Sequence, residues 1–294
     1  MKRIVIVGLM GMILFLNGCG SQEKVGICFR QNGDPLTQQL ETELTERLHE
    51  AGYRVIFCYA SMDQGRQHGQ IRKLLQNRVD YLVIEPVMAA ETETIARTAS
   101  AAETPLIFLE TPPNEDLLQR WDSVCYVSTR REQAGEMQRQ LIGEGILESA
   151  GSLVISGPED FLDGKSWAED SCRGFSFVKV ECGDWSRNSG RKLAGRALGM
   201  YGKELDVIFC HNPQMALGAL EAAKGYDRHV GEDLQIVALG LDWPLLEAIE
   251  SGQITGTVCT DPAALVEGVR QCLAGENPER IVWTEFMKKT AATE

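Results

Sequence analysis

Residues 205–225 read LDVIFCHNPQMALGALEAAKG, and this stretch decides the fold class. An apolar run at 207–211 ends at Asn212-Pro213, and a longer amphipathic run follows it. Asn is a preferred helix cap and proline is favoured in the first helical turn, so the spacing predicts a strand that passes directly into a helix. The same device follows the strand-like runs that end before Asp34-Pro35 and Asp261-Pro262.

Outward from this stretch, β-branched or aromatic runs alternate with amphipathic runs along the chain. Strands are predicted at 25–30, 53–60, 81–86, 106–110, 124–128, 152–156, 177–182, 207–211, 235–240, 255–260 and 281–286. Helices are predicted at 36–51, 65–77, 89–102, 132–145, 167–173, 192–201, 214–225, 244–251 and 263–274. This alternation predicts an α/β fold with parallel sheets, and two similar halves indicate two lobes. Such sheets bind ligands at the carboxyl ends of their strands.

The N-terminus has the layout of a secretory signal. Lys2 and Arg3 precede an uncharged apolar run, Ile4 to Leu16. About thirteen residues are too few for a permanent transmembrane helix, which needs roughly 20. The tetrapeptide 16–19, Leu-Asn-Gly-Cys, resembles a bacterial lipobox, which implies cleavage of signal peptide 1–18, a lipid anchor at Cys19 and an exported, membrane-tethered protein. The open alternative is an ordinary cleaved signal with a chance cysteine.

The net charge limits the classes of binding partner, and the cysteine content indicates the redox setting. Without Lys2 and Arg3, 27 of the 29 basic residues remain against 42 acidic ones, a net charge of −15. This balance disfavours nucleic acid and anionic membrane surfaces as partners. Eight further cysteines stand at positions 28, 58, 125, 172, 182, 210, 259 and 272, with no CxxC pair. Those within apolar runs are predicted to be free core residues, which suggests an anaerobic or mildly reducing setting.

The sequence contains no complete motif for catalysis or for metal binding. Residues 157–166 resemble a P-loop, but six residues stand where that motif needs four, and three of them are acidic. The four histidines form no metal-type pair, although His211, at a strand end, could line a site. No nucleophile, base and orienting group can be assembled, so neither an enzyme, a metal site nor a cofactor is expected.

Three stretches resemble the type I periplasmic sugar-binding family, most closely its galactose/glucose-binding branch. They are 105–110 (PLIFLE) followed by 126–129 (YVST), then 211–222 (HNPQMALGALEA), and 238–242 (ALGLD) with 256–258 (GTV) beyond it. The resemblance covers nearly all of residues 24–286. It implies two Rossmann-like lobes joined by a three-strand hinge near Thr129, Thr260 and Arg280. The N-terminal lobe would comprise 24–128 plus 261–280, and the C-terminal lobe 129–260 plus 281–294.

The resemblance also implies a set of ligand-binding residues. Asp34, Trp185, Asn212 and Asp242 match family ligand positions and keep a suitable type. Asp34 would accept hydroxyl protons, Trp185 would stack on the ligand, and Asn212 and Asp242 would hold its oxygens. The set is completed by Glu110 and Thr260, which replace asparagines of the branch, and by Trp167.

Two departures concern the ligand. Leu36 replaces the second stacking aromatic residue, and Ser171 replaces the sugar-clamping arginine, with Arg173 on another helix face. The predicted cleft is therefore acidic, which favours an amine-bearing ligand such as an amino sugar, because a buried unpaired charge is costly.

The leading hypothesis is a solute-binding lipoprotein that delivers a sugar or sugar-like solute to the permease of an ABC-type importer. The alternative is a ligand-sensing accessory protein for a chemoreceptor or membrane kinase. A repressor effector domain shares the fold, but its DNA-binding element would occupy the place of the signal peptide. A further alternative is that the site no longer binds a sugar and instead binds another kind of small ligand.

Overall fold

The computed structural model describes residues 22–111, 113, 115–142, 150–158, 164–277 and 279–291. The predicted signal peptide, the Cys19 anchor and residues 159–163 of the P-loop-like segment lie outside these ranges. Within the described part of the chain, no helix is both long enough and apolar enough to cross a membrane.

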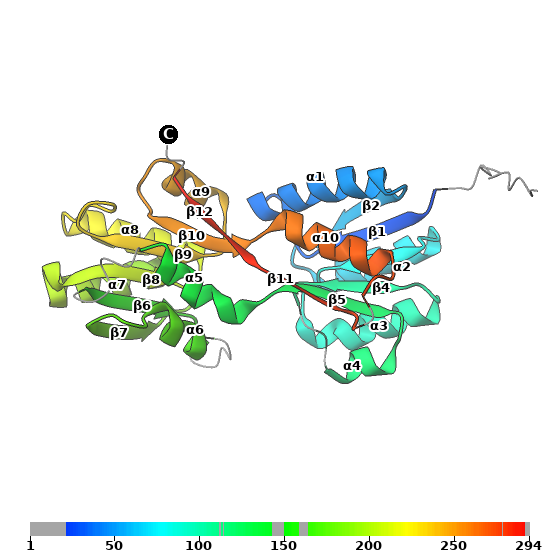
Figure 1. Cartoon of the computed structure of the whole chain (residues 1–294), viewed down its shortest axis with the longest axis horizontal. Helices are drawn as coiled ribbons and strands as arrows, with labels where there is room; N and C mark the ends of the chain where they lie inside the picture. The colour runs from blue at the N-terminus through cyan, green and yellow to red at the C-terminus, as the bar shows by residue number, and fades with distance from the viewer. Residues whose placement is uncertain are drawn as a thin grey trace, which may run out of the picture.

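The described strands form two six-stranded sheets, one in each lobe (Figure 1). The first has the order β11-β5-β4-β3-β1-β2, and all of its pairs are parallel. Its strands are β1 (Lys24–Phe29), β2 (Arg54–Tyr59), β3 (Tyr81–Ile84), β4 (Leu106–Leu109), β5 (Val124–Thr129) and β11 (Ile281–Thr284). The helices of this lobe are α1 (Pro35–Glu50), α2 (Gln64–Gln76), η1 (Ala89–Glu91), α3 (Thr92–Ala101), α4 (Glu115–Arg120) and α10 (Pro262–Leu273).

The second sheet has the order β12-β10-β9-β8-β6-β7, in which β12 alone is antiparallel to its neighbour. Its strands are β6 (Gly151–Ser156), β7 (Phe177–Cys182), β8 (Leu205–Cys210), β9 (Gln235–Leu239), β10 (Gly256–Thr260) and β12 (Phe286–Thr290). Its helices are η2 (Arg131–Gln133), α5 (Ala134–Gln140), α6 (Gly164–Ser171), α7 (Arg187–Tyr201), η4 (Gly202–Glu204), α8 (Pro213–Gly225) and α9 (Trp243–Glu250). The predicted α/β fold with two parallel-dominated sheets is confirmed.

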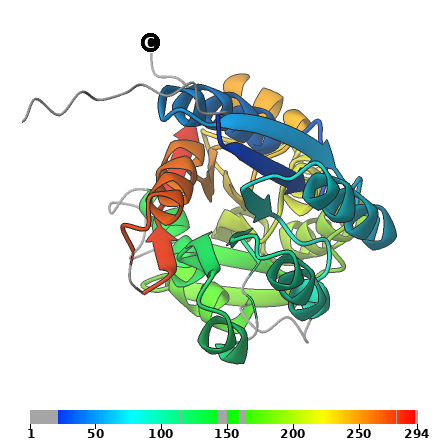
Figure 2. The ribbon, with the colours of Figure 1, turned by 90° about the vertical axis from the view of Figure 1, so that its right-hand side faces the viewer.

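Each sheet is buried on both faces, which explains why its strands are apolar runs rather than alternating ones. In the first lobe, α1 and α10 pack on one face, while α2, α3 and α4 pack on the other. Figure 2 shows α10, from the C-terminal part of the chain, beside α1. In the second lobe, α7, α8 and α9 cover one face, and α5 and α6 cover the other.

The last predicted strand, 281–286, is two strands of different sheets. Ile281–Thr284 pairs with β5 in the first sheet, and Phe286–Thr290 pairs with β10 in the second. The third crossing therefore lies at Glu285, so the boundary near Arg280 was wrong and 281–284 belong with the first sheet. Arg280, at φ 59°, makes the turn into β11 instead. One apolar run cannot show which sheet receives each half.

Candidate functional site

A cavity of about 380 Å³ lies between the lobes, at the carboxyl ends of both sheets. This volume is in the usual range of small-molecule sites, and the position is the one that open α/β sheets use for ligands. The first lobe, including α10, contributes Phe29, Arg30, Gln31, Asp34, Leu36, Thr37, Leu40, Glu85, Leu109, Glu110 and Leu265. The crossing segments and the second lobe contribute Arg131, Ala134, Trp167, Trp185, His211, Asn212, Pro213, Leu239, Gly240, Leu241, Cys259, Thr260 and Phe286.

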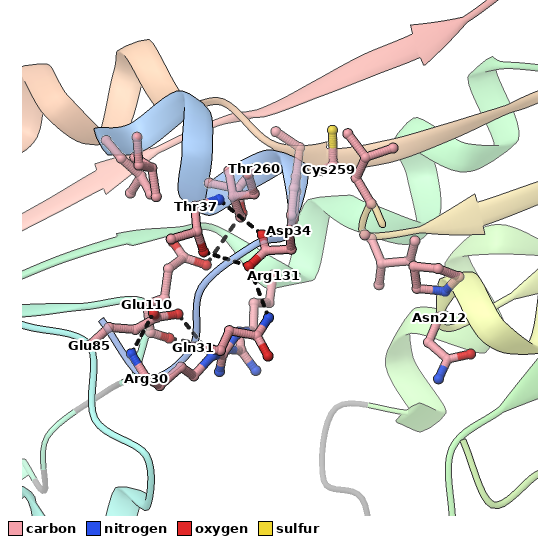
Figure 3. A pocket seen from close by; sticks show the side chains of 18 of the residues that line it. Arg30, Gln31, Asp34, Thr37, Glu85, Glu110, Arg131, Asn212, Cys259 and Thr260 are labelled. Carbon is pink, nitrogen blue, oxygen red and sulfur yellow. Dashed lines mark hydrogen bonds and ion pairs between the residues drawn. The ribbon is translucent and has the colours of Figure 1, made fainter. Parts of the chain in front are cut away.

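Asp34 and Glu110 form an acidic wall on the first-lobe side (Figure 3). Asp34 caps α1, as the sequence predicts: its Oδ1 accepts from Thr37 N at 2.9 Å. Its Oδ2 accepts from Thr37 Oγ1 at 2.6 Å and from Gln31 Nε2 at 3.2 Å. These neutral donors fix the carboxylate at the edge of the cavity without neutralising it.

Glu110 links this wall to the crossing segments. Its Oε1 accepts from Thr129 N at 3.1 Å and from Thr129 Oγ1 at 3.0 Å, and its Oε2 accepts from Thr260 Oγ1 at 3.3 Å. Thr284 Oγ1, on the third crossing, donates to Thr129 Oγ1 at 3.3 Å. Glu110 adopts φ 58°, in the left-handed region that costs free energy for a residue other than glycine. A group that binds Glu110 would therefore lie beside the segments that cross between the lobes.

Glu85 and Arg30 form an ion pair beneath the acidic wall. Arg30 Nε lies 2.9 Å from Glu85 Oε1, and Arg30 N donates to Oε2 at 3.2 Å. Burial raises the pKa of Glu85, Arg30 lowers it, and the negative charges of Glu110 and Asp34 raise it again. The three carboxylates are thus close enough to repel one another.

The second-lobe side is an aromatic wall. Trp167 and His211 stack at 4.2 Å between ring centroids with 10° between planes, and Trp185 lies 5.3 Å from His211. Trp167 is buried, and its Nε1 donates to Gln138 Oε1 at 2.6 Å. Burial lowers the pKa of His211 to about 4, and the nearby charge of Arg131 acts in the same direction. The imidazole is therefore neutral at pH 7 and extends the apolar surface.

Trp185 depends on two features of the backbone. Its φ is 68°, and Asn212 Nδ2 donates to its carbonyl oxygen at 2.8 Å. A Cβ at Gly157 would lie 2.2 Å from the Trp185 ring. Gly157, the first glycine of the P-loop-like segment, is thus explained by the space that the tryptophan ring needs.

The structure brings six of the seven predicted ligand residues to the cavity. Asp34, Glu110, Trp167, Trp185, Asn212 and Thr260 line the cavity. Asn212 Oδ1 also caps α8 by accepting from Met215 N at 2.8 Å, so both of its polar atoms have protein partners. Their contact with a ligand stays a prediction.

Asp242 does not line this cavity. It caps α9, where its Oδ1 accepts from Leu245 N at 2.8 Å and its Oδ2 accepts from Gln214 Nε2 at 2.6 Å. These two contacts satisfy the carboxylate outside the cavity lining, and a contact of Asp242 with a ligand stays a prediction. Asp261, the third predicted cap, lines a separate hollow between the ends of α1, α9 and α10.

The arginines of the cavity were missed. Ser171 is buried and donates to Trp167 O at 2.8 Å, while Arg173 pairs with Asp170 on the surface, so neither supplies the family's arginine. Arg30 and Arg131 line the cavity instead, which makes it less acidic than predicted. Arg30 and Glu85 could have been found as polar residues that directly follow β1 and β3, whereas Arg131 reaches the cavity from η2.

Among the described residues, no group of three or more histidine, cysteine, aspartate or glutamate side chains could hold a metal ion. The polar groups of the cavity suit hydroxyl and amino groups of a ligand, and its aromatic wall suits the C–H face of a ring.

Residues 25–272 match the family model of the periplasmic binding protein domain. The chain belongs to the type I periplasmic sugar-binding protein family. A putative rhizopine-binding protein of Rhizobium meliloti is 25% identical over 247 residues, which cover 78% of this chain and 77% of the relative. The ribose import binding protein RbsB of Bacillus subtilis is 22% identical over 274 residues, covering 90% and 84%.

Solved structures of periplasmic binding proteins have the same fold. An ABC transporter solute binding protein from Bacillus halodurans with bound myo-inositol superposes with a TM-score of 0.68 at 20% identity, covering 93% of this chain and 96% of the other. The ribose import protein and the solved ABC transporter protein are binding proteins for transport, whereas another match, 20% identical over 230 residues, is the transcriptional repressor PurR of Photobacterium profundum. The matches do not single out the galactose/glucose branch, so that finer resemblance stays a prediction.

Proposed function

We propose that this chain is an exported, lipid-anchored solute-binding protein that captures a small sugar or sugar-like polyol and delivers it to an ABC-type importer. The observation that carries the proposal is a cavity between two lobes with an acidic wall on one side and an aromatic wall on the other. Carboxylates accept hydrogen bonds from hydroxyl groups, and aromatic faces cover the C–H surface of a sugar ring. The ribose import protein and the myo-inositol complex among its relatives support a polyhydroxylated ligand.

A thermal-shift screen tests ligand capture. Binding to the folded state raises the apparent melting temperature, so the purified protein should be stabilised by at least one member of a panel of pentoses, hexoses and polyols. Trp185→Ala should abolish that shift, because it removes the exposed face of the aromatic wall, whereas Trp283→Ala, a half-exposed tryptophan of β11, should leave it intact. A full panel without a shift, or a shift that survives Trp185→Ala, contradicts the proposal.

The tether is proposed from the lipobox-like tetrapeptide that ends at Cys19. A lipidated Cys19 would keep a two-lobed binder close to its permease without a transmembrane helix. After expression in a bacterium, the protein should fractionate with membranes, and Cys19→Ser should release it. Equal membrane association of both forms contradicts the anchor and leaves ligand capture unaffected.

A further inference from the structure

We propose that the ligand carries a primary ammonium group, and that Asp34 and Glu110 bind it. This inference rests on the proposed function and specifies the chemical class of the solute.

The cavity is lined by both acidic and basic side chains. Among the described residues that line it, the charged ones are three carboxylates, Asp34, Glu85 and Glu110, and two guanidinium groups, Arg30 and Arg131. Glu85 is paired with Arg30, and Arg131 Nη2 donates to the main-chain oxygen of Glu110 at 3.1 Å rather than to its carboxylate. Within the described part of the chain, neither Asp34 nor Glu110 forms an ion pair with a cationic side chain, so the acidic wall is open to a cation from a ligand.

Each of these two carboxylates already accepts three hydrogen bonds from the protein. Asp34 accepts from Thr37 N, Thr37 Oγ1 and Gln31 Nε2, and Glu110 accepts from Thr129 N, Thr129 Oγ1 and Thr260 Oγ1. A carboxylate offers about four lone-pair sites, so each retains room for roughly one more donor. The N-terminus of α1 offsets the charge of Asp34 by about half an elementary charge and therefore incompletely.

A primary ammonium group is the cation that best fits the space between Asp34 and Glu110. An ammonium group has three donors on one compact centre, which suits two carboxylates with one open site each. Enclosure between the lobes would strengthen both contacts, because a pair removed from water is screened less. The aromatic wall opposite can cover the carbon skeleton that carries the amine, or attract the cation through a ring face. An ammonium here would also relieve the repulsion that raises the pKa of Glu85.

Matched sugars test the inference. Titration calorimetry at pH 6.5 should be run with D-glucose, D-glucosamine and N-acetyl-D-glucosamine, and with the corresponding galactose and mannose series. We expect at least one amino sugar to bind ten times more tightly, or better, than both its neutral parent and its N-acetyl form. The neutral parent matches the amine in size but lacks the charge, and the acetylated sugar retains the nitrogen without the charge.

Two isosteric variants locate the contact. Asp34→Asn keeps helix capping, because Asn caps as well as Asp, and Glu110→Gln keeps one accepting oxygen, which can serve Thr129. Each should reduce the preference for the amine to less than threefold. The matched controls are Asp63→Asn, the cap of α2, and Glu103→Gln, another glutamate at positive φ, and both should preserve the preference.

The outcomes separate the two proposals. If neutral sugars bind as tightly as their amines, or if both cavity variants retain the full preference, the ammonium inference is overturned while sugar capture stands. If no neutral or amino sugar of the three series and no pentose or polyol of the thermal-shift panel binds, the proposed function itself is overturned. Circular dichroism and melting temperatures of the variants identify any loss that comes from unfolding.

Discussion

At the scale of single residues, the sequence predicted which residues cap helices, but it did not predict which of these caps line the cavity. Asp34 and Asn212 follow strands and precede proline, so their capping role was predicted and is confirmed. For Asp242 the family resemblance implied a ligand role, and the structure shows a cap of α9 that does not line the cavity. A capping sequence fixes a helix end, but it does not fix which space that end faces.

His211 gives a pH prediction at this scale. Its pKa is near 6.5 when unfolded and about 4 when folded, because burial disfavours the charged imidazole. Between these values the unfolded chain binds a proton that the folded chain does not, so stability should fall as the pH drops from 6.5 toward 4. The loss attributable to His211 is up to about 3 kcal/mol.

Denaturation in urea between pH 4.5 and 7.5 checks this value. His211→Gln should flatten the acid side of the stability profile relative to the parent, while His49→Gln, at an exposed position on α1, should not. Carboxylates also titrate in this range, so the difference between parent and variant carries the test. Parallel profiles for all three proteins would show that His211 is not the group responsible.

At the scale of elements, strand register brings cysteines together that are far apart in the chain. Cys28 on β1 is the register partner of Cys58 on β2, and the proximity of the two thiols raises the pKa of Cys28 and lowers that of Cys58. Helix packing does the same for Cys125 on β5 and Cys272 on α10, where the pKa of Cys125 is lowered and that of Cys272 is raised by the neighbouring thiol. Isolated core cysteines were predicted, so these contacts are a finding of the fold.

The two pairs should form disulfides under mild oxidation. For Cys28 and Cys58, adjacent strands lie about 4.8 Å apart, within the Cα separation that a disulfide accepts. For Cys125 and Cys272, the packing of α10 on β5 brings the two thiols together. With glutathione disulfide, the Cys58 thiolate would displace one glutathione thiolate, and Cys28 would lose its proton and displace the second. Peptide mass spectrometry without reductant should find the 28–58 and 125–272 bridges.

Controls for this reaction come from cysteines in other settings. Exposed Cys182 should form a mixed disulfide with glutathione, and buried Cys210 should stay reduced. Cys28→Ser should eliminate the first bridge without affecting the second. Stable glutathione adducts at Cys58 in the parent protein, with no 28–58 bridge, would contradict the prediction.

At the scale of the whole molecule, one hydrogen bond spans the mouth between the lobes. Trp243 Nε1, at the start of α9 in the second lobe, donates to Gly33 O in the first lobe at 2.5 Å. The indole stays partly exposed. The bond therefore favours the arrangement in which the lobes meet at this point.

Trp243→Phe should weaken ligand binding by about 2- to 12-fold, because a net hydrogen bond contributes about 0.5–1.5 kcal/mol and the closed arrangement would be less populated before binding. Small-angle scattering should show a larger radius of gyration for the unliganded variant. Trp121→Phe, within the first lobe, is the matched control. Unchanged affinity and radius in Trp243→Phe would exclude a role in closure.

The sequence by itself determined the alternation of strands and helices, the two-lobe plan and the caps at strand ends, because these follow from local periodicity and from the chemistry of adjacent residues. Only the tertiary structure decided which of these ends share a cavity. It placed Arg30 and Glu85 together, removed Asp242 from the cavity wall and moved the third crossing to Glu285. Those outcomes depend on sheet order and on the meeting of segments up to 210 residues apart, which no local pattern encodes.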